Sequence, residues 1–284
     1  MKKVKNWDLI ITSRRGWLDF KINEIWYYRD LLLLLVKRDF TTFYKQTVLG
    51  PLWFLIQPAI STLVFTIILN KIAKISTEEI PPQLFYMSGI IAWNYFSTCL
   101  ISTSNTFTLN ATLFEKVYFP RIIFPLSKVI SGLTTFFVQL LLFLAFYFFF
   151  IVSGNNHINP SLNGLFLLPL MIVQMAILGQ GLGMILSSLT IKYRDLSYLI
   201  SFGVQLLMYA TPIVYPLSTV PSEYKIYISL NPMTSIIESF RQAFFGNGTL
   251  TLDGIMISSI SCAITFIMGL LIFNKVERTF IDTV

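Results

Sequence analysis

Apolar residues gather in blocks of about twenty along most of this chain, and short polar stretches separate the blocks. A helix rises 1.5 Å per residue, so about twenty apolar residues cross the roughly 30 Å hydrocarbon core of a bilayer. The pattern therefore predicts an all-α polytopic membrane protein. Its six transmembrane helices are expected at about 52–70, 84–104, 128–152, 165–189, 196–214 and 254–274.

The segment before the first span has a different pattern. In residues 6–47, aromatic and aliphatic residues return every three or four positions among basic residues, as in a helix that lies in the headgroup region. The apolar run 31–36 reaches only about 9 Å and cannot span. We therefore predict cytoplasmic amphipathic interface helices in 1–50, a break at Gly50-Pro51, and a membrane domain in 51–284.

The stretch 215–250, between the fifth and sixth predicted spans, contains two apolar segments that are each too short to cross. Asn231-Pro232 separates them, and glycines close the second. We predict a re-entrant helical hairpin that acts as an outer gate, because irregular backbone at membrane depth must pack on protein or line a cavity. An interfacial loop is the alternative. Glu238 and Arg241 lie one helical turn apart and are expected to pair, either within the gate or as an ordinary ion pair at the outer interface.

Composition and charge support a membrane protein with a defined orientation. Hydrophobic residues make up 55% of the 284 residues and charged residues 12%, about half the ~25% of an average soluble domain. Of the 21 Lys and Arg residues, only Lys71, Lys74, Lys225 and Arg241 lie on the outer face of the predicted topology. The positive-inside rule therefore places both termini in the cytoplasm.

Several kinds of chemistry have no support in the sequence. There is no Gly-x-x-x-x-Gly-Lys-[Ser/Thr] motif, so no phosphate-binding loop is expected. With one histidine and two cysteines inside apolar blocks, we predict no metal site, no cofactor, no disulfide and no catalytic nucleophile. Gly179 and Gly183 lie inside a predicted span and are expected to allow close packing of another helix. Because the spans also lack the acidic residues and lysines of proton-coupled carriers, energy is expected to come from a cytoplasmic partner.

The predicted cytoplasmic loop 105–128 has features of a protein-docking element. A short helix is expected to end before Pro120, with aromatic and charged side chains around it. An interfacial turn anchored by aromatic residues explains the same pattern. The candidate docking residues are Phe114, Glu115, Lys116, Tyr118, Phe119 and Arg121.

Several motifs resemble those of one transporter family, the membrane subunits of bacterial polysaccharide ABC exporters. These are type-2 ABC permeases that serve O-antigen, teichoic acid and some capsule export. The first motif runs from Lys37-Arg38-Asp39 through Tyr44-Lys45-Gln46-Thr47-Val48-Leu49-Gly50-Pro51-Leu52-Trp53 to Gln57-Pro58. The resemblance continues, in the family's order, through Phe119-Pro120-Arg121, Pro125-Leu126, 190–195, 211–216, Asn231-Pro232-Met233, Ile237-Glu238 and Phe240-Arg241.

The resemblance implies a homodimer in the bacterial inner membrane with two separate ATPase subunits, which bind ATP and Mg²⁺. The complex would move a lipid-linked polysaccharide outward, and nucleic acid is not an expected partner. The docking residues of the 105–128 loop would couple to the ATPase. Lys37, Arg38, Asp39, Tyr44 and Lys45 would form a cytoplasmic gate, and Asn231, Pro232, Glu238 and Arg241 the outer gate.

The substrate is expected to meet aromatic side chains along its path, because sugar rings have apolar faces that stack on them. The candidates are Trp53, Phe54, Tyr86, Trp93, Tyr95 and Phe96, although most membrane aromatics serve lipid contact or packing. Basic residues near the N-terminus suit either a pyrophosphate-linked lipid or anionic membrane lipids. O-antigen is the favoured cargo; teichoic acid or capsule, a drug or small lipid, and a membrane-embedded transferase are the alternatives.

Overall fold

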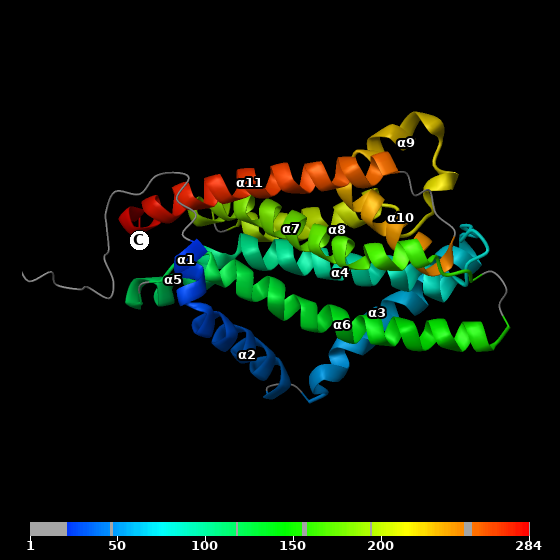
Figure 1. Cartoon of the computed structure of the whole chain (residues 1–284), viewed down its shortest axis with the longest axis horizontal. Helices are drawn as coiled ribbons and strands as arrows, with labels where there is room; N and C mark the ends of the chain where they lie inside the picture. The colour runs from blue at the N-terminus through cyan, green and yellow to red at the C-terminus, as the bar shows by residue number, and fades with distance from the viewer. Residues whose placement is uncertain are drawn as a thin grey trace, which may run out of the picture.

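The computed structural model describes residues 22–45, 48–117, 119–154, 158–193, 195–246 and 252–283. Every regular element in these ranges is helical (Figure 1). Most of the predicted interface helix, residues 1–21, lies outside the described ranges. The elements, with η marking 3-10 and π turns, are α1 (Ile22–Tyr27), α2 (Arg29–Lys45), η1 (Gly50–Leu52), α3 (Trp53–Phe65), η2 (Thr66–Ile72), α4 (Pro82–Ser104), α5 (Thr106–Lys116), α6 (Ile123–Val152), α7 (Leu162–Lys192), α8 (Leu196–Ala210), η3 (Leu217–Thr219), α9 (Ser222–Ser229), α10 (Pro232–Phe245) and α11 (Leu252–Thr283).

Five of the six predicted spans coincide with helices that are long and apolar enough to cross a bilayer. These five are Gly50–Ile72, Pro82–Ser104, Ile123–Val152, Gly164–Lys192 and Asp253–Glu277. The predicted fifth span, 196–214, differs. Helix α8 has 15 residues, which extend about 22 Å, less than a bilayer core. The helix ends at Ala210, and Thr211 has extended dihedral angles. The prediction that this span stays helical to residue 214 is therefore wrong for its last residues.

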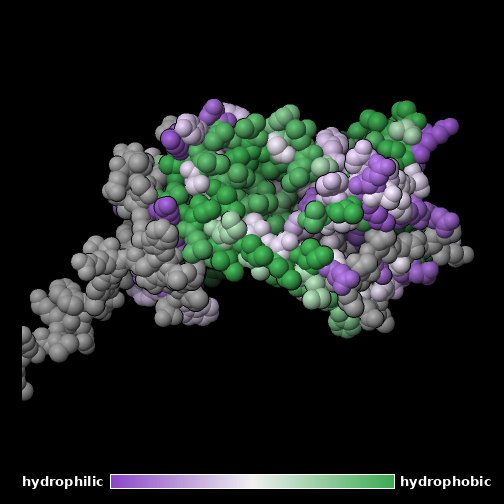
Figure 2. Space-filling view, turned by 90° about the horizontal axis from the view of Figure 1, so that it is seen from above, coloured by the Kyte–Doolittle hydropathy of each residue, from purple (hydrophilic) through white to green (hydrophobic). Residues whose placement is uncertain are grey.

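The long helices lie side by side and define two ends of the molecule. Helix α7 packs against α4, α10 and α11, and α6 packs against α4 (Figure 1). At one end lie α5 and the end of α11, and at the other lie α9 and α10; we call these the coupling end and the hairpin end. Figure 2 shows apolar side chains covering much of one face, with polar side chains concentrated at the hairpin end.

A sharp bend separates α2 from α3, as the Gly50-Pro51 pair predicts. Gly50 has a φ of 50°, in the left-handed region that glycine adopts without steric cost. Pro51 follows it within the short η1 turn, Gly50–Leu52, that leads into α3. The bend sends α2 back toward α6, against which it packs (Figure 1).

Glycines on two faces of α7 determine how closely its neighbours approach. A Cβ atom at Gly179 would lie 2.8 Å from the Cys99 Cβ, and one at Gly183 only 2.6 Å from the Thr103 Cβ, both on α4. On another face, a Cβ at Gly181 would lie 2.8 Å from the Phe266 Cα of α11. The packing role predicted for Gly179 and Gly183 is confirmed, since only glycine leaves room for these helices.

Replacing Gly183 with leucine tests this close packing. The new side chain would meet the Leu100 carbonyl oxygen, which lies 2.7 Å from the Cβ position. We expect the free energy of unfolding to fall by about 3 kcal/mol, the upper end of the range for overpacked sites. Thermal unfolding in detergent measures the effect. Gly203→Leu on α8 is the matched control, because a Cβ there meets nothing within 4 Å; equal melting of the two variants would contradict the packing argument.

Candidate functional site

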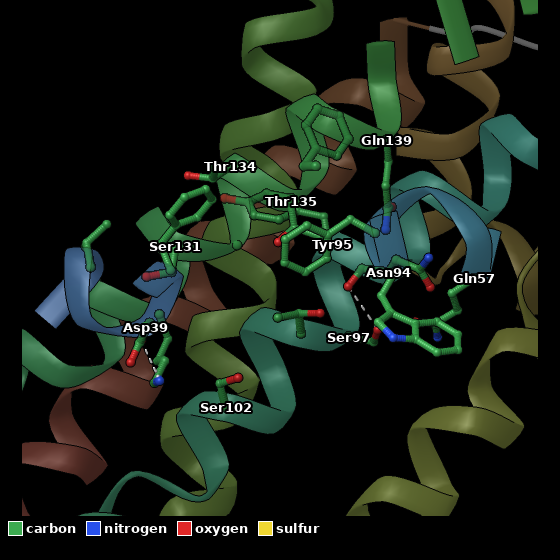
Figure 3. Close-up of a pocket in the computed structure, with 18 residues that line it drawn as sticks. Asp39, Gln57, Asn94, Tyr95, Ser97, Ser102, Ser131, Thr134, Thr135 and Gln139 are labelled. Carbon is green, nitrogen blue, oxygen red and sulfur yellow. Dashed lines mark hydrogen bonds and ion pairs between the residues drawn. The ribbon is translucent and has the colours of Figure 1, made fainter. Parts of the chain in front are cut away.

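A groove of about 390 Å³ opens between α2, α3, α4 and α6 (Figure 3). Its wall mixes aromatic rings with amide and hydroxyl side chains, an unusual lining between apolar helices. Trp53, Phe54 and Gln57 come from α3, and Asp39 comes from α2. The polar residues contributed by α4 and α6 are Asn94, Ser97, Thr98, Ser102, Lys128, Ser131, Thr134, Thr135 and Gln139.

Two polar stripes with helical spacing form the long walls of the groove. On α4, Asn94, Thr98 and Ser102 follow one another in steps of four residues, and on α6 Ser131, Thr135 and Gln139 do the same. Residues four apart lie on one helix face, so each set forms a continuous stripe. Because α4 packs against α6, the two stripes come together on one groove.

Some of the groove side chains keep their hydrogen-bonding capacity, whereas Ser97 in the groove and several serines elsewhere bond to a backbone carbonyl of their own helix. Ser88, Ser127 and Ser187 donate to the carbonyl oxygen three residues earlier, at 2.7, 2.8 and 2.6 Å. The Ser131 Oγ is buried without a partner. Gln139 is only 4% exposed, and within the described residues no protein group bonds its amide. Buried polar groups are normally satisfied, so a polar ligand or water must bond to this wall.

An ion pair joins α2 to α6 beside the groove. The Lys128 Nζ lies 2.5 Å from the Asp39 Oδ2, and the Arg38 Nη2 lies 3.0 Å from the Asp39 Oδ1 (Figure 3). The two charged residues that line the groove, Asp39 and Lys128, therefore neutralise each other. Of the other predicted gate residues, Lys37 and Lys45 are exposed, and the side chain of Tyr44 lies outside the described residues.

The predicted aromatic path residues divide into two groups. Trp53, Phe54 and Tyr95 line the groove, although Tyr95 is itself only 3% exposed and also packs in the core. Tyr86, Trp93 and Phe96 lie instead in the packed core, with exposures of 0%, 3% and 1%. Sequence reasoning missed the amides and hydroxyls of the two stripes, although their four-residue spacing inside apolar spans was a readable signal.

The predicted outer-gate segment forms two helices that meet at the expected Asn231-Pro232 break. Helix α9 is largely exposed, whereas α10 is buried along most of its length. Asn231 caps α10: its Oδ1 accepts from the Met233 amide, and its Nδ2 donates to the Thr211 hydroxyl at 3.0 Å. The depth of this hairpin in a membrane stays a prediction.

Arg241 connects α10 to the irregular turn that follows α8. Its Nη1 lies 3.2 Å from the Glu238 Oε1, its Nη2 donates to the Ile213 carbonyl at 2.9 Å, and its guanidinium lies 3.7 Å from the centre of the Phe85 ring. Arg241 is 1% exposed and Glu238 5%, so the predicted pair is present and lies buried within the protein. Arg241 thereby satisfies a backbone carbonyl that has left the helical pattern.

The end of α10 is held by the chain that leads into α7. The Asn159 amide donates to the Phe245 carbonyl at 3.3 Å, and the Ser161 amide donates to the Ala243 carbonyl at 3.1 Å. The Tyr147 hydroxyl on α6 donates to the Phe244 carbonyl at 2.7 Å. These bonds satisfy carbonyls that a helix end leaves without intrahelical partners.

The predicted docking loop contains mostly buried residues at the coupling end. Phe114 and Phe119 pack with Phe124, and Arg121 lies 5.2 Å from the Phe114 ring centre. The Arg121 Nη1 donates to the Glu277 carbonyl of α11 at 3.0 Å. Lys116 is exposed, whereas the Glu115 side chain and the whole of Tyr118 lie outside the described residues.

A family model for ABC-2 type transporters matches residues 30–245, which include the groove, the docking loop and the hairpin. The chain belongs to the ABC-2 type transporter family. Together with its apolar helices, this makes it a multi-pass membrane protein and the permease component of an ABC transporter.

Relatives of this ABC-2 transporter match along most of their length. The chain is 32% identical to the O-antigen export system permease protein RfbA of Klebsiella pneumoniae, over 90% of this chain and 95% of that protein. It is 29% identical to the protein of the same name from Myxococcus xanthus, over 79% and 84%. It is 21% identical to the polysialic acid transport protein KpsM of Escherichia coli, over 87% and 93%.

Separate and combined alanine replacements of Glu238 and Arg241 test the buried pair of this transporter. Removing one partner of a buried ion pair costs about 3–5 kcal/mol of stability, because it leaves the other charge uncompensated. We expect Arg241→Ala to destabilise more than Glu238→Ala, since it also removes the donor to Ile213. Thermal unfolding of both variants measures this difference.

The double variant gives the interaction between the two side chains. We expect it to lose at least about 1 kcal/mol less than the sum of the single losses, as for residues in direct contact. Additive losses would show that the two side chains do not stabilise each other.

Proposed function

We propose that this permease is the membrane subunit of an ATP-driven exporter that moves a lipid-linked polysaccharide, most simply an O-antigen, out across the bacterial inner membrane. The similarity to O-antigen export permeases over nearly the whole of both chains supports this proposal. The lower identity to a polysialic acid transport protein, 21%, favours O-antigen over capsule as the cargo.

The groove is consistent with a sugar cargo. Sugar hydroxyls donate and accept hydrogen bonds, and the amides of Asn94 and Gln139 offer both kinds of partner. The rings of Trp53 and Tyr95 add flat apolar surfaces for the faces of sugar rings. Binding sites for small ligands likewise combine an apolar wall with a few polar groups.

The energy source in this proposal is a separate pair of ATPase subunits that bind ATP and Mg²⁺ and act on a homodimer of the permease. The sequence contains no phosphate-binding motif of its own. The exposed Lys116 and Val117 at the coupling end offer a contact for an ATPase. Beneath them, the bond from Arg121 to Glu277 ties the loop to α11. A push on the loop would therefore reach a spanning helix.

The proposed orientation places the coupling end in the cytoplasm. Lys116, Lys192 and Lys275 lie close to the ends of helices at that side of the molecule, in agreement with the positive-inside rule. The cytoplasmic gate of the proposal centres on Asp39, because this residue connects α2 to α6 beside the groove. The hairpin then faces outward.

Complementation tests the proposed function. A bacterium that lacks its own O-antigen export permease would receive this chain together with its partner ATPase. We expect O-antigen to return to the cell surface, measured by lipopolysaccharide gels and surface antibody binding. An ATPase variant without its phosphate-binding lysine is the control and should restore nothing. Intact expression in the membrane without surface O-antigen would overturn the proposal.

Changes at Lys116 and Arg121 test the coupling role. Lys116→Glu changes an exposed charge, so we expect at least a tenfold loss of export with little change in thermal stability. Arg121→Lys shortens a buried side chain that bonds to the Glu277 carbonyl, so it should lower both export and thermal stability. Lys225→Glu, at the hairpin end, is the matched surface control. Export by the Lys116 variant at the wild-type rate would remove this residue from the ATPase contact.

A further inference from the structure

We infer that the groove between α3, α4 and α6 binds an uncharged stretch of glycan, and that Asn94 and Gln139 are its main hydrogen-bonding contacts. The inference rests on the proposed function for the identity of the ligand as a glycan. It adds a location within one protomer and a chemical class, neutral rather than polyanionic sugar.

Polar groups on the groove wall have donors and acceptors that form no hydrogen bond with the rest of the described protein. Within the described residues, no protein group bonds the amide side chains of Asn94 and Gln139. The Ser131 Oγ beside them is buried and also lacks a partner. An amide has two N–H donors and an acceptor oxygen, a set that matches vicinal hydroxyls. A polyhydroxylated ligand would therefore satisfy groups that otherwise depend on water.

The charge of the lining disfavours a polyanion. Among the lining residues only Asp39 and Lys128 carry charge, and they lie 2.5 Å apart, so the lining itself has no net charge. Arg38, which does not line the groove, also binds the Asp39 carboxylate and leaves the three-residue cluster with a single excess positive charge. A polymer with a carboxylate on every sugar would therefore lose water from several charges and meet only one excess cation, which is unfavourable. A neutral sugar meets no such barrier.

The shape and the aromatic rings suit a short segment of chain. The volume of about 390 Å³ lies near the lower end of the range for small-ligand sites, roughly 300–1,000 Å³. Trp53, Tyr95 and Phe136 place rings on the same wall as the amides. Gln57 is exposed and also lines the groove, so a polymer that slides past would meet it as well. The groove thus holds a few sugars at a time.

Direct binding to the purified full-length chain in lipid nanodiscs tests this inference. Maltoheptaose serves as the neutral probe and a sialic acid heptamer as the anionic probe, and the dissociation constants come from calorimetry. We expect maltoheptaose to bind at least fivefold more tightly. Asn94→Leu and Gln139→Leu should each weaken its binding by about threefold to tenfold, the effect of one lost hydrogen bond.

Two further variants control for folding and for charge. Gln180→Leu on α7 removes another buried amide that has an unpartnered Nε2 but does not line the groove, and it should leave binding unchanged. Gln57→Lys adds a cation at an exposed lining position, so it should reduce or reverse the preference for the neutral probe. Thermal unfolding confirms that every variant is folded.

The possible outcomes separate this inference from the proposed function. Equal or tighter binding of the sialic acid heptamer by the native chain, or no binding of maltoheptaose, overturns the chemical class. Identical affinities for Asn94→Leu, Gln139→Leu and Gln180→Leu overturn the location. Selective binding of the neutral probe by a chain that fails to restore O-antigen export would support the groove and contradict the exporter proposal alone.

Discussion

Buried backbone groups must form hydrogen bonds, and this constraint explains the contacts between helices at the hairpin end. Helix α8 ends at Ala210, and the chain continues as a buried, irregular turn whose carbonyls have no helical partners. Arg241 supplies a donor to the Ile213 carbonyl, while Glu238 neutralises its charge. Because an unsatisfied group is costly in an apolar setting, this single side chain allows the irregular segment to exist.

The groove shows the opposite arrangement at the other side of the α4–α6 contact. At the hairpin end, side chains and backbone amides satisfy nearby carbonyls, including those of Ala243, Phe244 and Phe245. In the groove, the Ser131 hydroxyl and the side-chain amides of Asn94 and Gln139 have no partner among the described residues of the protein. A structure gains rigidity from the first arrangement, whereas the second leaves bonding capacity for a ligand. The same helices thus provide a stable wall and a site that binds sugars in the proposed function.

In the proposed exporter, the docking loop has a mechanical role as well as a contact surface. Of the aromatic residues predicted as docking contacts, Phe114 and Phe119 lie inside the protein, where they form one cluster with Phe124. Arg121 links this cluster to the Glu277 carbonyl. In the proposed exporter the exposed Lys116 meets the ATPase, and the buried residues carry the movement to α11.

The sequence by itself determined the helical class, five spans, the bend at Gly50-Pro51 and the break at Asn231-Pro232, because these depend on the length of apolar runs and on local backbone preferences. It also indicated the close packing at Gly179 and Gly183 and the pairing of Glu238 with Arg241, since both follow from helical spacing. Only the tertiary structure decided that α8 ends early, that Tyr86, Trp93 and Phe96 are core residues, and that two polar stripes face one groove. Those features depend on which helix faces meet, and the pattern along one helix does not determine its neighbour.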